Sequence, residues 1–244
     1  MTRRGVIASL VAMQSAPALA RLSDPMPRMS YFPADAHAAL RSNPAAIISI
    51  YNAHRDRFVA DLGAGFAKEV EDHVKLGFCG LVAYDLTPYG PHGGNAAVPV
   101  PSLYNVASMD CDNYAAVTWR LFNILCPASS VSVAAVGWDG GPIGNHAQIF
   151  SSHPSGTAWL VDPTIGVVQC EYDFDWIASG RPTPEGHRKD FYWRAGDAVQ
   201  WLHDRVIEAL DKGEYRPSQL LYYATTIDKF LDAAPMGKWM TPRA

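Results

Sequence analysis

Cysteine is scarce in this sequence, with Cys79, Cys111, Cys126 and Cys170 the four examples among 244 residues. Four cysteines in a chain of this length do not form a disulfide scaffold, so each one needs its own explanation. Basic residues are also in the minority, because 20 Lys and Arg stand against 24 Asp and Glu and the net charge is −4. Proteins that bind nucleic acids need a basic surface for the phosphates, so we expect no nucleic-acid partner.

Long apolar runs, internal repeats and low-complexity segments are missing as well. A membrane-spanning helix needs about 20 apolar residues, so we expect no stable membrane anchor. Hydrophobic residues nevertheless make up 48% of the chain, which is typical of a globular protein and excludes wholesale disorder.

The first 20 residues differ from the rest of the chain. Arg3 and Arg4 precede a short apolar run over 5–13, and Ala18-Leu19-Ala20 places small residues at a signal-peptidase site. This pattern predicts a signal peptide over 1–20 and export to the periplasm or the extracellular space, by a Sec or a twin-arginine route. The alternative is a helical N-terminal arm. Removal of 1–20 takes away two arginines and no acids, so 18 basic residues remain against 24 acidic ones and the net charge becomes −6.

The remaining residues, 21–244, are expected to form a single α+β domain. Asn43 followed by Pro44 predicts a helix start, and Gly63 predicts its end. Further helices are expected over 65–76, 111–125, 197–210 and 218–234. Alternating patterns between turns predict an antiparallel meander of three strands over 131–138, 146–151 and 157–162. The Pro- and Gly-rich segment 87–102 is expected to be an exposed loop.

Three residues in this arrangement point to nucleophilic catalysis. Cys111 begins a predicted helix, where free backbone amides and the helix dipole favour a thiolate. His146 begins the second predicted strand and Asp162 ends the third, so a hairpin would bring both to one end of the sheet. We expect Asp162 to hold the Nδ1–H of His146 and to leave Nε2 facing the sulfur, as in a catalytic triad. Taken singly, each residue also fits an ordinary structural role.

The runs CDNYA, NHAQIF and WLVDPT resemble the transglutaminase-like superfamily of papain-fold cysteine enzymes. The resemblance covers about residues 100–168, and the Trp-x-x-Asp-Pro-Thr segment is its most specific part. It implies a catalytic helix packed on an antiparallel sheet with flanking helices. It also implies a triad of Cys111, His146 and Asp162, and acyl transfer through a thioester at Cys111 with no cofactor.

The sequence departs from the family pattern next to the nucleophile. Members often carry Gly two residues before the cysteine and an aromatic residue after it, where this chain has Met109 and Asp112. Asp110 and Asp112 flank the thiol with negative charge, which opposes thiolate formation. The backbone N–H of Cys111 is a candidate oxyanion donor, and the side chain of Asn105 or Tyr104 is a candidate for the second donor.

These observations favour an exported cysteine hydrolase or acyltransferase that acts on an amide bond of a peptide or protein, with cell-wall peptide as a candidate substrate. One alternative is another secreted Cys-His enzyme, such as a papain-like cell-wall peptidase. An arylamine acetyltransferase shares the triad order, but an exported chain would lack acetyl-coenzyme A. A catalytically silent papain-fold binding module is a further alternative. No spacing typical of zinc ligands occurs, and one pair among Cys79, Cys126 and Cys170 could form a disulfide.

Overall fold

We analysed a computed structural model, which describes residues 30–66, 70–90, 104–138, 145–170, 182, 185–191, 199–216, 219–226 and 229. The predicted signal peptide and most of the predicted 87–102 loop lie outside these residues. In the described part of the chain, no helix has the length and apolar character to cross a membrane.

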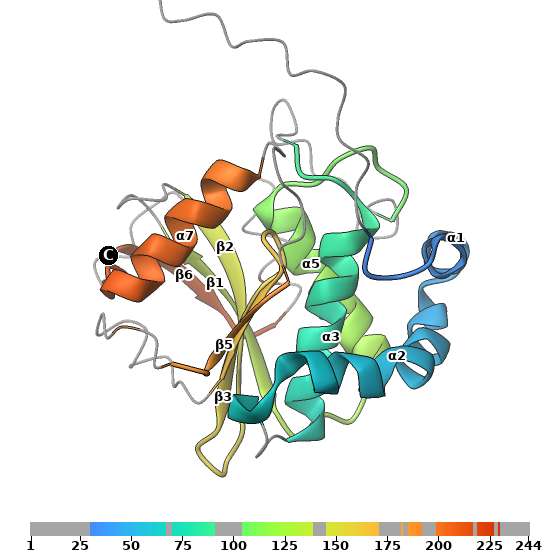
Figure 1. The fold of residues 1–244 in the computed structure, drawn as a ribbon, viewed down its shortest axis with the longest axis horizontal. Coiled ribbons are helices and arrows are strands. Elements are labelled where there is room, and N and C mark those ends of the chain that lie inside the picture. The colour runs from blue at the N-terminus through green and yellow to red at the C-terminus, as the bar shows by residue number, and fades with distance from the viewer. Residues whose placement is uncertain are drawn as a thin grey trace, which may run out of the picture.

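The protein has a mixed α+β fold built around a six-stranded antiparallel sheet (Figure 1). The strand order is β5-β4-β3-β2-β1-β6, and every neighbouring pair is antiparallel. The strands are β1 (Ser132–Trp138), β2 (His146–Ser152), β3 (Ala158–Asp162), β4 (Val167–Cys170), β5 (Arg188–Asp190) and β6 (Leu220–Ala224). The predicted three-strand meander is confirmed as β1, β2 and β3, and it forms the middle of a larger sheet.

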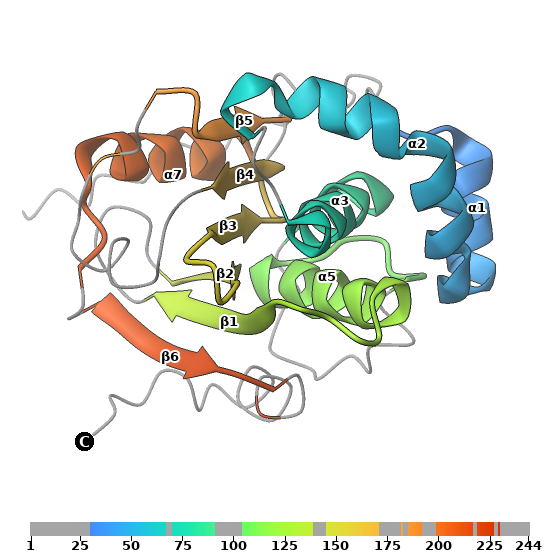
Figure 2. The same ribbon diagram turned by 90° about the horizontal axis from the view of Figure 1, so that it is seen from below.

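Helices cover both faces of this sheet (Figures 1 and 2). On one face lie α3 (Glu71–Leu86) and α5 (Cys111–Leu125), with α1 (Ala34–Ser42) and α2 (Ile47–Leu62) outside them. On the other face lies α7 (Gln200–Lys212). Each face has its own apolar cluster: Ala147 and Ile149 of β2 belong to the α3/α5 side, and Phe150 belongs to the α7 side. Because side chains alternate along a strand, His146 and Gln148 share the α7 face with Phe150.

The start and the end of α2 follow from the local sequence. The side chain of Asn43 accepts a hydrogen bond from Ala45 N–H at the start of the 3₁₀ turn Pro44–Ala46, which leads directly into α2. Gly63 ends α2 at φ 89°, a conformation that favours glycine. Both predicted boundaries are therefore confirmed, and the predicted helix over 111–125 agrees with α5.

α3 differs from the predicted helix over 65–76, because it begins at Glu71 and runs on to Leu86. The predicted helix ends at residue 76, directly before Gly77. In the structure, Gly77 and Gly80 lie inside α3, where this helix meets β3. A Cβ at Gly77 would lie 2.7 Å from the Trp159 ring, and one at Gly80 would lie 2.4 Å from Val161 Cγ1. The two glycines therefore allow the close approach of α3 to the strand that carries Asp162.

The C-terminal third also corrects the sequence-based prediction. Residues 220–224, predicted as part of a helix over 218–234, form β6 and pair with β1 at the sheet edge. β4 and β5 were not predicted at all. A short apolar run such as LLYYA has no clear period, so its pairing with β1, distant in sequence, determines its structure.

Candidate active site

The N-terminal turn of α5 presents Cys111 as its first residue. Asp110 caps the helix by accepting from Asn113 N–H at 3.1 Å, and the Asn113 side chain accepts in return from Asp110 N–H at 3.5 Å. The first intrahelical bond is made by Tyr114 N–H to Asp110 O. The amides of Cys111 and Asp112 precede that bond, so they lie in the part of the helix where N–H groups have no intrahelical partner.

His146 and Asp162 form a buried pair at the end of the sheet. His146 is the first residue of β2 and Asp162 is the last of β3, as predicted. Their side chains are each 1% exposed, and Nε2 of His146 lies 2.7 Å from Oδ2 of Asp162. The hairpin therefore brings together the two residues that we expected it to bring together.

The two ring nitrogens of His146 have exchanged the roles expected from sequence. Asp162 contacts Nε2 in place of the expected Nδ1. An ionised carboxylate can only accept a hydrogen bond, so this contact favours the tautomer with its proton on Nε2 and the lone pair on Nδ1. Nδ1 is buried and has no hydrogen-bond partner among the residues that the structure describes. Asp162 is the last residue of β3, and the register of β2 and β3, in which Ile149 pairs with Val161, places it beside Gln148 and diagonal to His146.

Two further residues bind the Asp162 carboxylate and a third binds one of them, and the sequence alone did not point to any of the three. Gln148 Nε2 donates to Oδ2 at 2.9 Å, and Thr164 N–H donates to Oδ1 at 3.1 Å. Trp138 Nε1 donates to Gln148 Oε1 at 3.0 Å. The available signal was the two-residue spacing of His146 and Gln148, which places both on one face of a strand.

Cys111 is half-buried and lies beside the first residues of β2. Its sulfur is 4.0 Å from Asp112 Oδ1, and the Ala147 backbone N–H points to it and favours the thiolate. Within the described residues, no hydrogen bond joins this sulfur to either ring nitrogen of His146. The structure thus brings together His146 and Asp162, and it leaves Cys111 next to them without a direct bond.

Burial and negative charge determine the acidity of Cys111. Burial has the largest effect, and with Asp112, Asp110 and Asp162 it raises the pKa of the Cys111 thiol well above its usual value. The pKa of the thiol is therefore raised, in the direction opposite to the lowering expected from its place at a helix N-terminus. The expectation that Asp110 and Asp112 oppose the thiolate is confirmed.

Asp112 and Tyr89 complete the surroundings of the thiol. Burial, followed by the charge of Asp110, raises the pKa of Asp112 to about 7, while His146 acts in the opposite direction. Burial raises the pKa of Tyr89 to about 12, with added contributions from Cys111 and Asp110. Tyr89 also forms a parallel bridge with Met109, which ties the beginning of the predicted 87–102 loop to the start of α5.

The two candidate oxyanion side chains have other contacts. Asn105 is exposed and its amide lies 3.4 Å from the backbone carbonyl of Arg41. Tyr104 is buried, and burial raises its pKa to about 12 while the charge of Arg120 lowers it. Among the described contacts of these two side chains, none is with Cys111, so their oxyanion role stays a prediction.

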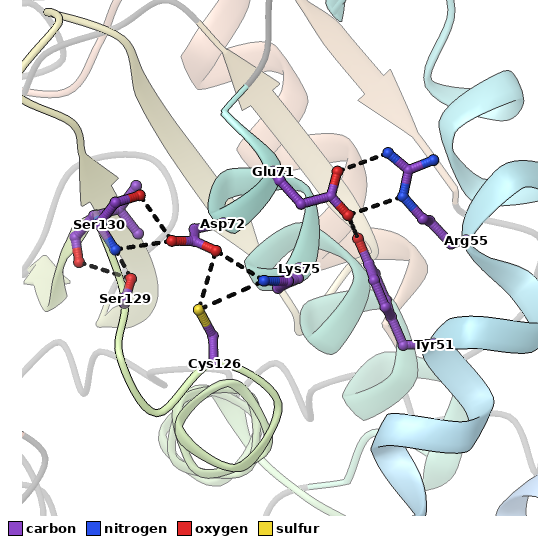
Figure 3. A network of polar contacts seen from close by, with 9 residues as sticks. Tyr51, Arg55, Glu71, Asp72, Lys75, Cys126, Ser129 and Ser130 are labelled. Atoms are coloured by element: carbon purple, nitrogen blue, oxygen red, sulfur yellow. Dashed lines mark hydrogen bonds and ion pairs between the residues drawn. The ribbon is translucent and has the colours of Figure 1, made fainter.

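The other three cysteines are buried and Cys111 is half-buried, and no disulfide joins any two of the four. Cys126 follows α5 and donates to Asp72 Oδ1 at 3.0 Å (Figure 3). The same carboxylate accepts from Lys75 Nζ at 2.9 Å, from Ser130 N–H at 2.8 Å and from Ser130 Oγ at 2.7 Å. This network joins the first turn of α3 to the segment between α5 and β1.

No protein-family model matches this sequence, and neither a curated protein nor a solved structure is detectably similar to it. Function must therefore be argued from the residues and their geometry. In the described ranges, no three His, Cys, Asp or Glu side chains gather in a way that could hold a metal ion.

Proposed function

We propose that this chain is an exported cysteine hydrolase or acyltransferase of the transglutaminase-like type. It would act on an amide bond of a peptide or protein through a thioester at Cys111. The observation that carries the proposal is the buried His146–Asp162 pair, in which Nδ1 of His146 has no hydrogen-bond partner among the described residues. The imidazole also lies close enough to the first turn of α5 to affect the pKa of Asp112, the neighbour of Cys111. A histidine oriented by a carboxylate and beside a helix-leading cysteine is an arrangement suited to nucleophilic catalysis.

The reaction would begin with transfer of the Cys111 proton to Nδ1 of His146. The sulfur then attacks the substrate carbonyl carbon, and the amides of the first turn of α5 are placed to donate to the oxyanion. Nδ1–H returns the proton to the leaving amine, which departs and leaves the acyl group on sulfur. Water, activated by the same nitrogen, releases the acid; an amine in place of water would give a transferred product.

The free protein holds Cys111 as a neutral thiol, because burial and three carboxylates disfavour its charge. We therefore propose general-base assistance from His146 during attack, in place of a preformed thiolate–imidazolium pair. A substrate that displaces water and brings Sγ toward Nδ1 would complete the missing contact, since catalytic hydrogen bonds often tighten only when substrate is bound.

The finer fold assignment and the location belong to the same proposal. A cysteine-leading helix against antiparallel strands that carry His and Asp is similar to the catalytic core of transglutaminase-like enzymes. Residues 1–20 support export, and export makes cell-wall peptide a candidate substrate and water the abundant acceptor. Expression of the full chain in a bacterial host and mass spectrometry of the exported protein should show cleavage after Ala20. An exported protein that keeps these residues would contradict the signal assignment.

Acylation by p-nitrophenyl acetate tests the catalytic proposal without knowledge of the natural substrate. Sulfur attack on this ester releases p-nitrophenolate and leaves one acetyl group on the enzyme, so both products can be measured. We expect a rapid phase of release and acetyl on Cys111, identified by mass spectrometry of peptides. Cys111→Ala should abolish this phase, and the matched control Cys170→Ala should retain it. Equal release by the wild type and Cys111→Ala would contradict the proposal.

A catalytically silent binding module is the second candidate, and the raised pKa of Cys111 favours it. Such a module would use the same end of the sheet to hold a peptide without turnover. Failure of wild-type acylation, together with equal binding of a cell-wall peptide mixture by wild type and Cys111→Ala, would support this candidate over the enzyme.

A further inference from the structure

The Asp162 carboxylate is held by donors whose own orientation is determined by a more distant group. An indole N–H can only donate, so Trp138 Nε1 requires the oxygen of the Gln148 amide to face it. The amide nitrogen of Gln148 must then face Asp162, and this is the contact observed at 2.9 Å. Trp138 therefore determines that the nitrogen of the Gln148 amide, and not its oxygen, faces Asp162.

The donors around Asp162 also constrain the imidazole of His146. Oδ2 of Asp162 accepts from Gln148 and Oδ1 accepts from Thr164 N–H, so the carboxylate is surrounded by donors and is held as an acceptor. His146 must supply the third donor through Nε2–H, and its lone pair then lies on Nδ1. Each member of this chain of contacts is buried, which protects the arrangement from competing water.

We infer that Gln148, oriented by Trp138, is a positioning residue that keeps His146 in the Nε2–H tautomer and so keeps Nδ1 basic. Gln148 would act through Asp162 and would not touch substrate. Tyr215 packs on this network from the α7 side, where its ring lies on that of Trp138 with centroids 4.7 Å apart. The catalytic use of Nδ1 rests on the proposed function, but the tautomer does not.

The test reads the tautomer directly from the ¹⁵N chemical shifts of the His146 ring in the full-length protein. Wild type should show a protonated Nε2 and an unprotonated Nδ1 at neutral pH. Gln148→Met keeps the side-chain length and removes the donor, so we expect a mixture of tautomers in which the two nitrogen shifts approach each other. The matched control is Gln169→Met, another buried glutamine on the α7 face, and it should leave the His146 shifts unchanged.

Trp138→Phe provides a second route to the same state, because it removes the indole donor and leaves Gln148 free to turn its amide. It should also populate both tautomers, which keeps the inference testable if Gln148→Met does not fold. A wild-type tautomer in a folded Gln148→Met or Trp138→Phe protein would overturn the inference.

Acylation by p-nitrophenyl acetate then separates the inference from the proposed function. We expect about tenfold slower acylation of Gln148→Met than of wild type, the order expected for one lost hydrogen bond to a charged group. If wild type is not acylated but the tautomer changes as described, the proposed function fails and the positioning role stands. If wild type is acylated and the tautomer does not change, the positioning role fails alone.

Discussion

Two cysteine–aspartate neighbours in this molecule show opposite electrostatic behaviour. In one, Cys126 donates to Asp72 at 3.0 Å and the pKa of Asp72 is lowered, because its bonds to Ser130, Cys126 and Lys75 outweigh its burial. In the other, Cys111 lies 4.0 Å from Asp112, and burial with the charge of Asp110 raises the pKa of Asp112 to about 7.

The difference shows that the partners of a carboxylate matter more than the adjacent thiol. Asp72 has two Ser130 donors and the Lys75 ammonium around it, so its charge is stabilised and the network can hold α3 to the chain before β1. Asp112 faces the like charge of Asp110, and among the described residues His146 is the group that acts to keep Asp112 ionised. The first arrangement suits structural stability, and the second keeps an unstable charge beside a candidate nucleophile.

The largest effect is expected where the structural carboxylate is removed. Asp72→Ala deprives Ser130, Lys75 and Cys126 of their shared acceptor, and should lower the free energy of unfolding by about 3 kcal/mol at pH 7. Urea unfolding measures this loss of stability. The control Asp56→Ala removes a carboxylate that is 97% exposed and should change stability by less than about 0.5 kcal/mol. A loss as small as that of the control would show that the Asp72 network contributes little.

Low pH should reduce the difference in stability between wild type and Asp72→Ala. The pKa of Asp72 is depressed in the folded protein, so its contribution is present above the unfolded value of about 3.9 and is lost as pH falls below it. The stability gap between wild type and Asp72→Ala should therefore narrow below about pH 4. A gap that stays constant from pH 7 to pH 3 would contradict the ionic role of Asp72.

Asp112→Asn should change the free energy of unfolding in the opposite direction to Asp72→Ala. The folded protein keeps a proton on Asp112 up to about pH 7, whereas the unfolded chain releases it near pH 4, so stability falls as pH rises through this window. Removal of the charge should therefore stabilise the protein at pH 8 by about 1 kcal/mol, or ~2–4 °C in Tm, and should have little effect near pH 4. A stabilisation that does not depend on pH would contradict this origin.

The same variant should change the reactivity of the neighbouring thiol. Loss of the Asp112 charge lowers the pKa of Cys111, so alkylation of Cys111 by iodoacetamide at pH 7.5 should be faster in Asp112→Asn than in wild type, by about tenfold. Peptide mass spectrometry separates Cys111 from Cys126, whose rate should not change. Equal acceleration at both cysteines would point to general loosening of the fold.

The smallest effect is expected for Lys75→Met. Lys75 is partly exposed, and Ser130 and Cys126 still donate to Asp72 when the ammonium is gone. The loss should be about 0.5–1 kcal/mol in urea unfolding. A loss equal to that of Asp72→Ala would mean that the ion pair, and not the Ser130 bonds, dominates the network.

The sequence predicted best where local rules determine structure. The helix over 111–125 begins at a capping aspartate and has an apolar stripe, and the hairpin that joins His146 to Asp162 follows from alternation and turns. β6 and the full length of α3 were missed. In the first case a short apolar run pairs with a distant strand, and in the second Gly77 and Gly80 serve close packing on β3 and not helix termination.

For the candidate site, residue types were easier to predict than their surroundings. Cys111, His146 and Asp162 carry chemistry that a sequence shows, whereas a sequence does not show which ring nitrogen of His146 meets Asp162. The role of Gln148 depends on Trp138, ten residues earlier on the neighbouring strand. The acidity of Cys111 depends on burial, which the position at a helix N-terminus does not reveal.

The neighbours His146 and Ala147 both belong to the candidate site. The imidazole of His146 pairs with Asp162, and the backbone N–H of Ala147 points to the sulfur of Cys111. A slip of β2 by one residue would reverse every side chain of the strand, so it would separate the histidine from its carboxylate and break the apolar packing at once. The register of β2 therefore determines both the packing of the sheet and the assembly of the candidate site, so one pairing error would disrupt both.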